Sequence, residues 1–152
     1  MASILFRRAE KADLPDIVRL LADDPLGASR EIVSDPVGEQ YLAAFEAIDG
    51  DPNQLLAVAA EAVDIVGCLQ LTFVPGLSRA GMWRGQIESV RIAAGQRGTG
   101  LGKRFFEWAI ERCRERDCGL VQLTSDKCRP DAIRFYEALG FRPSHEGLKL
   151  AL

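Results

Sequence analysis

The chain is predicted to fold as one domain, spanning residues 1–152, that contains both helices and strands. Its 152 residues are enough to bury a substantial hydrophobic core. A composition of 47% hydrophobic and 27% charged residues is typical of a globular protein. Segments with strand-like and helix-like hydrophobic periodicity follow one another along the chain, and a glycine-rich turn joins one such strand to an amphipathic helix within residues 88–116. These observations predict a mixed α and β domain.

The N-terminal part predicts a strand followed by a helix. Residues 4–9 are predicted to form the first strand. Asp13 is expected to cap the helix that follows, with Pro15 in its first turn and Asp16 three residues after the cap. The residues predicted to form the buried stripe of this helix are Leu14, Ile17, Val18 and Leu21.

A polar connection then leads to a second helix and two strands. Residues 23–36 contain two prolines and a glycine and are read as the connection. The second helix is predicted over residues 37–48, before a Gly-Asp-Pro stop. Residues 54–62 and 65–73 are predicted strands, joined by a tight turn near residues 63–64.

The central part predicts a loop, a strand and a helix. Residues 75–85 are glycine-containing and read as a loop, and residues 86–92 as the strand after it. A helix is predicted over residues 101–116. Its broad apolar face consists of Leu101, Phe105, Phe106, Ala109, Ile110 and Cys113.

The C-terminal part predicts one more strand and helix and a final hairpin. Residues 120–124 form a short apolar segment, read as a strand. Pro130 is a favourable first helical residue, and Gly140 is a favourable residue just beyond a helix end. A hairpin-like tail, residues 141–143 and then 147–152, is expected to complete the sheet.

The glycine-rich turn has the features of a phosphate cradle. Gly98, Gly100 and Gly102 allow close backbone approach and leave N–H groups pointing outward. The helix N-terminus adds partial positive charge, and Arg97 and Lys103 add full charges. The spacing does not fit a dinucleotide fingerprint, because Lys103 or Phe105 falls where the third glycine belongs, and a P-loop motif is absent. A plain strand-to-helix connection is the alternative reading of the turn alone.

Two motifs resemble those of one enzyme family. The segment from Arg97 to Gly102, Arg-Gly-Thr-Gly-Leu-Gly, resembles the coenzyme A pyrophosphate loop of the GNAT family of N-acetyltransferases. Downstream, residues 132–141 are similar to the family's A-x-x-F-Y-x-x-x-G-F signature. The motif-bearing resemblance covers residues 87–152. It implies an α+β fold, with a mixed, mostly antiparallel sheet flanked by about four helices.

The resemblance also implies a reaction, the transfer of an acetyl group from acetyl-CoA to the primary amine of a small molecule by direct attack in a ternary complex. A protein or peptide acceptor, and a non-catalytic CoA-binding regulatory module, are the alternatives. The strand residues near the thioester and pantetheine would offer backbone groups to the coenzyme, and the turn would bind its phosphates. The residues implied in binding acetyl-CoA are Val90, Arg91, Ile92, Arg97, Gly98, Thr99, Gly100, Leu101, Gly102 and Lys103.

Two side chains are candidates for proton transfer. Free amines are mostly protonated at neutral pH, so a base is needed, and Glu88 lies two residues before the coenzyme-binding strand segment. A solvated strand residue or a partner of Arg84 is its alternative role. Tyr136 occupies the family's general-acid position, and a place in the core stripe of its helix is the alternative. Many relatives have an asparagine that contacts the coenzyme three residues before the alanine of the second motif. This chain has Arg129 there, so that contact cannot be transferred to it.

Composition limits the remaining partners and cofactors. A net charge of −3 argues against general nucleic-acid binding. We expect no membrane segment or signal peptide, and hence a cytoplasmic protein. The four cysteines form no C-x-x-C motif and His145 is the one histidine, so no metal is expected and the cysteines are read as reduced thiols. The sequence leaves a homodimer open, and it does not identify the acceptor amine.

Overall fold

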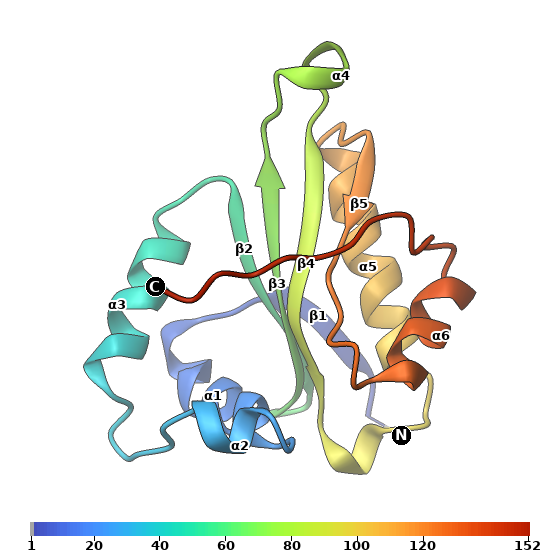
Figure 1. Cartoon of the computed structure of the whole chain (residues 1–152). Coiled ribbons are helices and arrows are strands. Elements are labelled where there is room, and N and C mark those ends of the chain that lie inside the picture. The colour runs from blue at the N-terminus through green and yellow to red at the C-terminus, as the bar shows by residue number, and fades with distance from the viewer. Residues whose placement is uncertain (1) are drawn as a thin grey trace.

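The computed structural model describes residues 2–152 and contains one five-stranded sheet in the order β1-β2-β3-β4-β5 (Figure 1). The first four strands are antiparallel neighbours, and β5 runs parallel to β4. The sheet is therefore mixed and mostly antiparallel, as expected. The strands are β1 (Ile4–Arg8), β2 (Gln54–Glu61), β3 (Asp64–Val74), β4 (Arg84–Ile92) and β5 (Leu120–Gln122).

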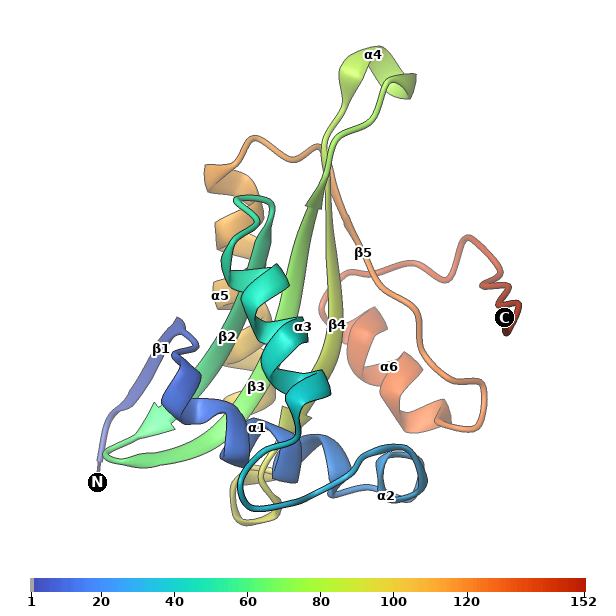
Figure 2. The ribbon, with the colours of Figure 1, turned by 90° about the vertical axis from the view of Figure 1, so that its left-hand side faces the viewer.

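Four helices of at least two turns surround this sheet within the described residues, again as expected. Figures 1 and 2 show α5 on one face of the sheet and α1 and α3 on the other, with α6 beyond β5. Short 3₁₀ turns precede α1 and α5. The helices are α1 (Leu14–Ala22), α3 (Glu39–Asp49), α5 (Leu101–Glu115) and α6 (Pro130–Ala138), with single turns at α2 (Gly27–Arg30) and α4 (Ser78–Gly81).

The alternation of side chains along the strands builds a core on each face of the sheet. On the α5 face, Leu69, Leu71 and Ile87 are buried together with the aromatic side chains of the helix. On the α1 face, Val58 and Cys68 pack with Ile17 and other α1 residues. Because β2 and β3 are buried on both faces, they form the rigid centre from which β4 extends toward the glycine turn.

A bulge interrupts β4 at Ser89 and changes which side chains face which helix. The pairing of β3 with β4 shifts register between Cys68 and Gln70, and Ser89 has a φ of 56°. Before the bulge, Ile87 faces the α5 core; after it, Val90 and Ile92 pack against the same core. One extra residue in a strand has this effect because successive side chains alternate between faces. Glu88 and Arg91 therefore both lie on the α1 side.

The parallel pair β4–β5 separates after three residue pairs. Only Arg84, Gly85 and Gln86 pair with β5, at Leu120, Val121 and Gln122. The β3 side of β4 stays paired as far as Ile92. The β5-facing edge of β4 therefore has no strand partner over residues 87–92 within the described chain, and the two strands diverge toward the glycine turn (Figure 1). We call this opening the β4–β5 splay.

The prediction that the Asp13 side chain caps α1 is wrong. Asp13 is the residue before the helix, but its carboxylate makes no capping hydrogen bond there. It instead accepts hydrogen bonds from Arg7 at 2.7 and 3.0 Å and from the backbone N–H of Glu10 at 2.7 Å. The carboxylate therefore closes the preceding 3₁₀ turn and does not cap α1. This arrangement is the stronger one because the charged Arg7 side chain on β1 adds two charge-assisted hydrogen bonds. In the helix itself Leu20 is buried, while Leu21 is only half-buried.

This ion pair predicts how stability depends on pH. Its hydrogen bonds from Arg7 hold the pKa of Asp13 below its usual range. The stabilisation is present above about pH 4, the unfolded pKa, and is lost as pH falls through the lower folded pKa. We expect Asp13→Asn to cost about 1.5–3 kcal/mol at neutral pH and to flatten the acid limb. Urea unfolding at several pH values measures both. Asp16→Asn is the control, because it removes the exposed ion pair between Asp16 and Arg19. An equal loss of unfolding free energy in this variant would contradict the role given to Asp13.

Three further expectations need correction. The tail after α6 forms no strand in the described chain and does not complete the sheet as a hairpin. The connection 23–36 contains α2, because the Asp24 carboxylate accepts a hydrogen bond from the Gly27 N–H and closes a turn. The loop 75–85 is shorter than expected, since β3 and β4 extend to Val74 and Arg84 around the single turn α4, in which Arg79 and Ala80 are left-handed.

Candidate functional site

The glycine turn between β4 and α5 is open to an approaching ligand. Gly98 and Gly100 have φ values of 78° and 85°, a region that side chains disfavour. A Cβ built at either position would meet no atom within 4 Å. These glycines are therefore required by backbone conformation, and no protein atom fills the space over them. Gly102 differs, because it is already helical and a Cβ there would touch Phe135 at 3.7 Å.

Unpaired backbone N–H groups collect at the same turn. The N–H of Arg104 donates to the Gly100 carbonyl at 3.2 Å, so the N–H groups of Leu101, Gly102 and Lys103 precede the first helical hydrogen bond. No side chain caps α5. The Thr99 hydroxyl does not turn outward but donates to the Gln96 carbonyl at 2.6 Å. A helix of 15 residues adds its dipole, so the turn is suited to an anion.

The two cations of the turn are placed differently. Arg97 reaches back across the chain, with Nη2 3.5 Å from an Asp23 carboxylate oxygen and Nε donating to the Ile92 carbonyl at 3.3 Å. Its guanidinium thus ties the turn to the end of α1. Lys103 lies one helical turn from Glu107, at 3.7 Å, with both side chains largely exposed. Such exposed pairs are weak, so Lys103 remains free to approach a phosphate.

Arg91 links β4 to the connection after α1. Its Nε lies 2.7 Å from Asp24 Oδ2. That approach is off the N–H axis, so it is an ion pair rather than a good hydrogen bond. The N–H of Gly27 and the charge of Arg91 hold the pKa of Asp24 below its usual range. The anionic Asp24 therefore faces the α1 side of β4, close to the splay.

Glu88 lies on that same side of β4. Its side chain is exposed, and its Cα pairs with Gln70 of β3. Arg84, the expected alternative partner, makes no ion pair with it within residues 2–152. Glu88 stands within the stretch of β4 that has no partner on its β5 side, immediately before the bulge at Ser89. Its carboxylate is thus available to a group bound on the α1 side of the splay.

Tyr136 has both an apolar and a polar environment. Its ring packs edge-on against Phe106, Phe135 and Phe141, with centroid distances of 5.4, 5.6 and 6.2 Å. Burial raises its pKa, and the nearby charges of Arg129 and Arg91 oppose that rise. Within the described residues its hydroxyl makes no hydrogen bond. The ring is therefore fixed by the core while the hydroxyl stays protonated and unengaged, beside the two arginines.

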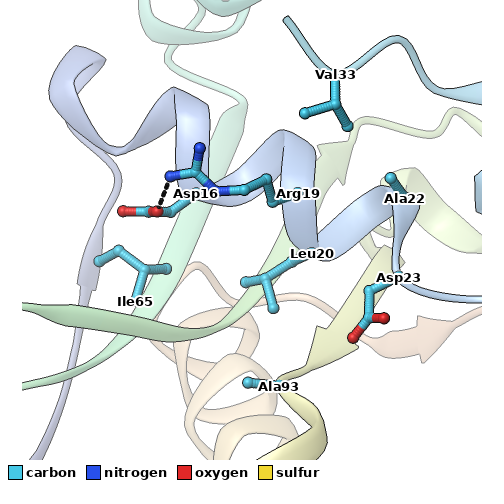
Figure 3. A pocket seen from close by; sticks show the side chains of 8 residues that line it. All are labelled: Asp16, Arg19, Leu20, Ala22, Asp23, Val33, Ile65 and Ala93. Atoms are coloured by element: carbon cyan, nitrogen blue, oxygen red, sulfur yellow. Dashed lines mark hydrogen bonds and ion pairs between the residues drawn. The ribbon is translucent and has the colours of Figure 1, made fainter. Parts of the chain in front are cut away.

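A hollow of about 450 Å³ lies beside α1 (Figure 3). Leu20, Ile65 and Ala93 form its floor, and the Asp16–Arg19 pair and Asp23 lie at its rim. Tyr136 and Glu88 do not line it. The hollow is therefore separate from the β4–β5 splay, and the candidate site is defined by the splay, the glycine turn and the α6 tyrosine.

The cysteines do not contribute to this site. Burial raises the pKa values of Cys68 and Cys113 to about 12, so both remain thiols at neutral pH. All four cysteines are unpaired. No cluster of three or more His, Cys, Asp or Glu side chains suited to a metal occurs in residues 2–152. In the same residues no helix is both long and apolar enough to cross a membrane.

Sequence reasoning named the main elements of this site but missed two of its determinants. The bulge at Ser89 carries no signal, because serine is not a residue that marks positive φ. The Asp24–Arg91 pair joins residues far apart in the chain. The position of Asp24 three residues before Gly27 is the one local hint of a turn there, since Asx residues often close turns.

The β4–β5 splay opens onto a glycine-rich helix N-terminus, which is suited to binding an anion. The Acetyltransferase (GNAT) family model matches residues 14–141. The chain therefore belongs to the GNAT family of acetyltransferases, and the resemblance seen in its motifs is confirmed.

Two curated relatives share part of the chain. An aminoalkylphosphonate N-acetyltransferase of Salmonella typhimurium is 32% identical over 95 residues, which are 62% of this chain and 61% of that protein. A glucosamine 6-phosphate N-acetyltransferase of Trypanosoma brucei brucei is 36% identical over 88 residues, 58% of each. The matches thus span about three fifths of these relatives.

Solved structures match over almost the whole chain. A transcriptional regulator from Bacillus halodurans is 49% identical, with a TM-score of 0.96 over 99% of this chain and 100% of that one. A Trypanosoma brucei acetyltransferase is 28% identical, with a TM-score of 0.80 over 99% and 100%. The α+β architecture is confirmed by these matches.

Proposed function

We propose that this protein is an acetyl-CoA-dependent N-acetyltransferase that acetylates the primary amine of a small molecule by direct attack in a ternary complex. The observation that carries the proposal is the β4–β5 splay, whose unpaired β4 edge leads directly to the open glycine turn. An extended amide-containing arm fits a free strand edge, and a pyrophosphate fits the turn. Family membership supports the same assignment.

In this proposal the backbone holds the coenzyme. Residues 98–103 donate N–H groups to the pyrophosphate, and Lys103 adds a charge. Arg97 acts indirectly, because its contacts to Asp23 and Ile92 hold the turn in place. Backbone groups of residues 90–92 bind the pantetheine arm, with the Arg91 side chain kept away from it by Asp24. Bound acetyl-CoA supplies the activated thioester; no metal is required.

Three groups of the chain then assist transfer. Glu88 accepts a proton from the incoming ammonium, directly or through water, so that the amine nitrogen can attack the thioester carbon. The N–H of Val90 stabilises the negative charge that develops on the carbonyl oxygen, a contribution of about 2.7–4 kcal/mol for such donors. Tyr136 donates its proton to the sulfur as the carbon–sulfur bond breaks. The nitrogen gives up its second proton, directly or through water, to the tyrosinate, which regenerates Tyr136. Amide, free thiol and a proton at Glu88 are the products.

The names of the curated relatives support a small amine as acceptor. Both proteins are described as acting on amines that carry a phosphonate or a phosphate. Arg129 lies close enough to Tyr136 and Asp24 for its charge to affect both pKa values, so it is placed to meet an anionic part of the acceptor. Initial rates with both substrates varied test direct attack. Intersecting reciprocal plots support it, whereas parallel plots would indicate an acetyl-enzyme and overturn this part of the proposal.

A regulatory module that binds CoA without turnover is the second candidate. It is favoured by the description of the 49% identical Bacillus halodurans protein as a transcriptional regulator. Two features favour the enzyme. The net charge of −3 argues against nucleic-acid binding, and the free Tyr136 hydroxyl supplies a proton donor that a module without turnover does not need. Acetylation of a protein is a third candidate function, and release of free thiol from acetyl-CoA in the presence of lysine peptides tests it. CoA binding without thiol release for any amine or peptide would support the module.

Replacement of Glu88 is expected to change the pH profile. Glu88→Gln removes the base but preserves shape, so turnover should fall most at low pH, where the acceptor is most protonated. The pH–rate profile of kcat/KM from pH 6 to 9 measures this. Glu46→Gln, at an exposed position of α3 and outside the splay, is the matched control. If Glu88→Gln kept both the rate and the acidic limb of the wild type, the carboxylate would have no role in proton transfer.

A further inference from the structure

The face of the sheet on the α1 side changes from apolar to polar along its strands. Under α1 it is apolar, with Val58 of β2 and Cys68 of β3 both buried. Beyond α1 the pairing register places one polar residue from each of four strands side by side, because directly paired residues point to the same face. These residues, which we call the glutamine row, are Gln54 of β2, Thr72 of β3, Gln86 of β4 and Gln122 of β5.

The glutamine row is concentrated and uncharged. Three of the six glutamines of the chain lie in it, and a fourth, Gln70, lies beside it toward α1. Charged residues make up 27% of the chain, yet the row contains none. A face that is merely solvated usually carries charged side chains. Neutral amides and a hydroxyl favour a surface that a ligand covers, because burying an uncharged polar group costs far less than burying a charge.

Lateral hydrogen bonds hold these side chains in place. Gln54 Oε1 accepts from Gln70 Nε2 and from Thr72 Oγ1, each at 3.0 Å. Gln86 Oε1 accepts from Gln122 Nε2 at 3.0 Å. In the described chain this leaves the amide nitrogens of Gln54 and Gln86 as free donors, and the amide oxygens of Gln70 and Gln122 as free acceptors. None of these four atoms is buried, so each can reach a ligand above the sheet.

The row lies where an acetyl acceptor would meet Glu88. Gln86 and Gln122 form the last residue pair before β4 and β5 separate, so they close the narrow end of the splay. Glu88 points to the same face, two residues or about 7 Å further along β4. Figure 1 shows no helix over this part of the sheet, which lies between α3 and α6 with only the tail in front of it. Figure 2 shows the end of the tail standing away from the sheet.

The free groups of the row determine which chemistry they can bind. A free amide N–H needs a hydrogen-bond acceptor and a free amide oxygen needs a donor, and a hydroxyl group is both. Neighbouring strands are about 4.8 Å apart, so these groups are close enough to meet several hydroxyls on one small carbon skeleton. An apolar amine that covered the row would leave the same groups without partners, which weakens its binding.

We propose that the glutamine row recognises the acetyl acceptor, and that this acceptor is a polyhydroxylated primary amine, such as an amino sugar or an amino polyol. Gln86 and Gln122 bind the hydroxyls nearest the amine, and Gln54 and Thr72 bind those further from it. These side chains determine specificity and take no part in proton transfer. The inference rests on the proposed function, because it assigns the acceptor of the same transfer.

Acceptor preference tests the role of the row. The probes are two pairs of amines, D-glucosamine with cyclohexylamine and D-glucamine with hexylamine. Preference is the kcat/KM of the hydroxylated amine divided by that of its counterpart. Q86M/Q122M replaces both partners of one hydrogen bond with apolar side chains of similar length, so neither is left unpaired in the fold. Its preference should be about 10-fold or more below that of the wild type, as expected for the loss of two hydrogen bonds to hydroxyls.

Two features of this design isolate the row. The same two amines are compared in both proteins, so differences in their own reactivity and pKa cancel. Gln40→Met is the control, because it changes an exposed glutamine of α3 outside the row and should keep the preference of the wild type.

Binding without turnover separates this inference from the proposed function. NMR spectra of isotope-labelled protein in the presence of CoA record the glutamine side-chain amides, and the signals missing in Q86M/Q122M belong to the row. D-glucosamine should shift these signals and cyclohexylamine should not. Such shifts in a protein that acetylates no amine would support the row and overturn the acetyl transfer. Equal preference in the wild type and Q86M/Q122M, an equal loss in Gln40→Met, or no shift with either hydroxylated amine would each overturn the role of the row.

Discussion

Tyr136→Phe should lose about 10²- to 10⁴-fold in turnover, the range typical of removing acid catalysis, while its melting temperature changes little. The ring contacts that anchor residue 136 to Phe106, Phe135 and Phe141 are all retained by phenylalanine. The hydroxyl has no hydrogen-bond partner among the described residues, so its removal leaves no unpaired group in the fold. Steady-state kinetics and thermal unfolding of the same preparation measure the two effects.

Phe141→Leu is the matched control for this prediction. It loosens the same aromatic cluster without touching the hydroxyl. We expect a lower melting temperature with turnover per folded molecule changed only a few-fold. The opposite pattern, in which Tyr136→Phe is destabilised yet fully active, would make residue 136 a core residue only. Bound water would then be the first alternative as proton donor.

Gly100→Glu should abolish acetyl-CoA binding. Gly100 has a φ of 85°, where a side chain costs about 1–2 kcal/mol in strain. The new carboxylate would also occupy the open space over the turn and repel the pyrophosphate. Calorimetry should detect no heat of binding in the variant, whereas the wild type should bind in the absence of any metal.

Gly95→Glu adds the same charge to the same segment and serves as the control. Gly95 lies in the 3₁₀ turn before the loop, has no positive φ, and also faces open space. Its variant should keep most of the affinity. Unchanged affinity in Gly100→Glu would show that the coenzyme does not lie over this turn.

The sequence predicted most of the fold because its signals are local. The glycine turn and the apolar face of α5 each depend on neighbouring residues, and the mixed, mostly antiparallel sheet followed from the family resemblance. The cap of α1 was predicted wrongly because Asp13 has a stronger partner in Arg7, six residues earlier on another element. Local capping rules do not include such a competing charge.

The site was predictable in part for the same reason. Gly98, Gly100 and Tyr136 stand in motifs, so their positions followed from spacing. The bulge at Ser89 and the Asp24–Arg91 pair depend on how β4 fits against β3 and α1, which no local pattern encodes. The tail was expected to complete the sheet as a hairpin, but it forms no strand in the described chain. A short local pattern does not say whether a segment finds a strand partner.

Release of free thiol from acetyl-CoA, recorded over a panel of primary amines, tests the enzymatic assignment most directly. The panel includes aminoalkylphosphonates, phosphorylated amino sugars, neutral amines and lysine peptides. We predict amine-dependent release for at least one small amine, a product heavier by one acetyl group, and strong loss of release in Tyr136→Phe. Tight binding of acetyl-CoA without amine-dependent release from any of these acceptors would contradict this prediction and favour the regulatory module.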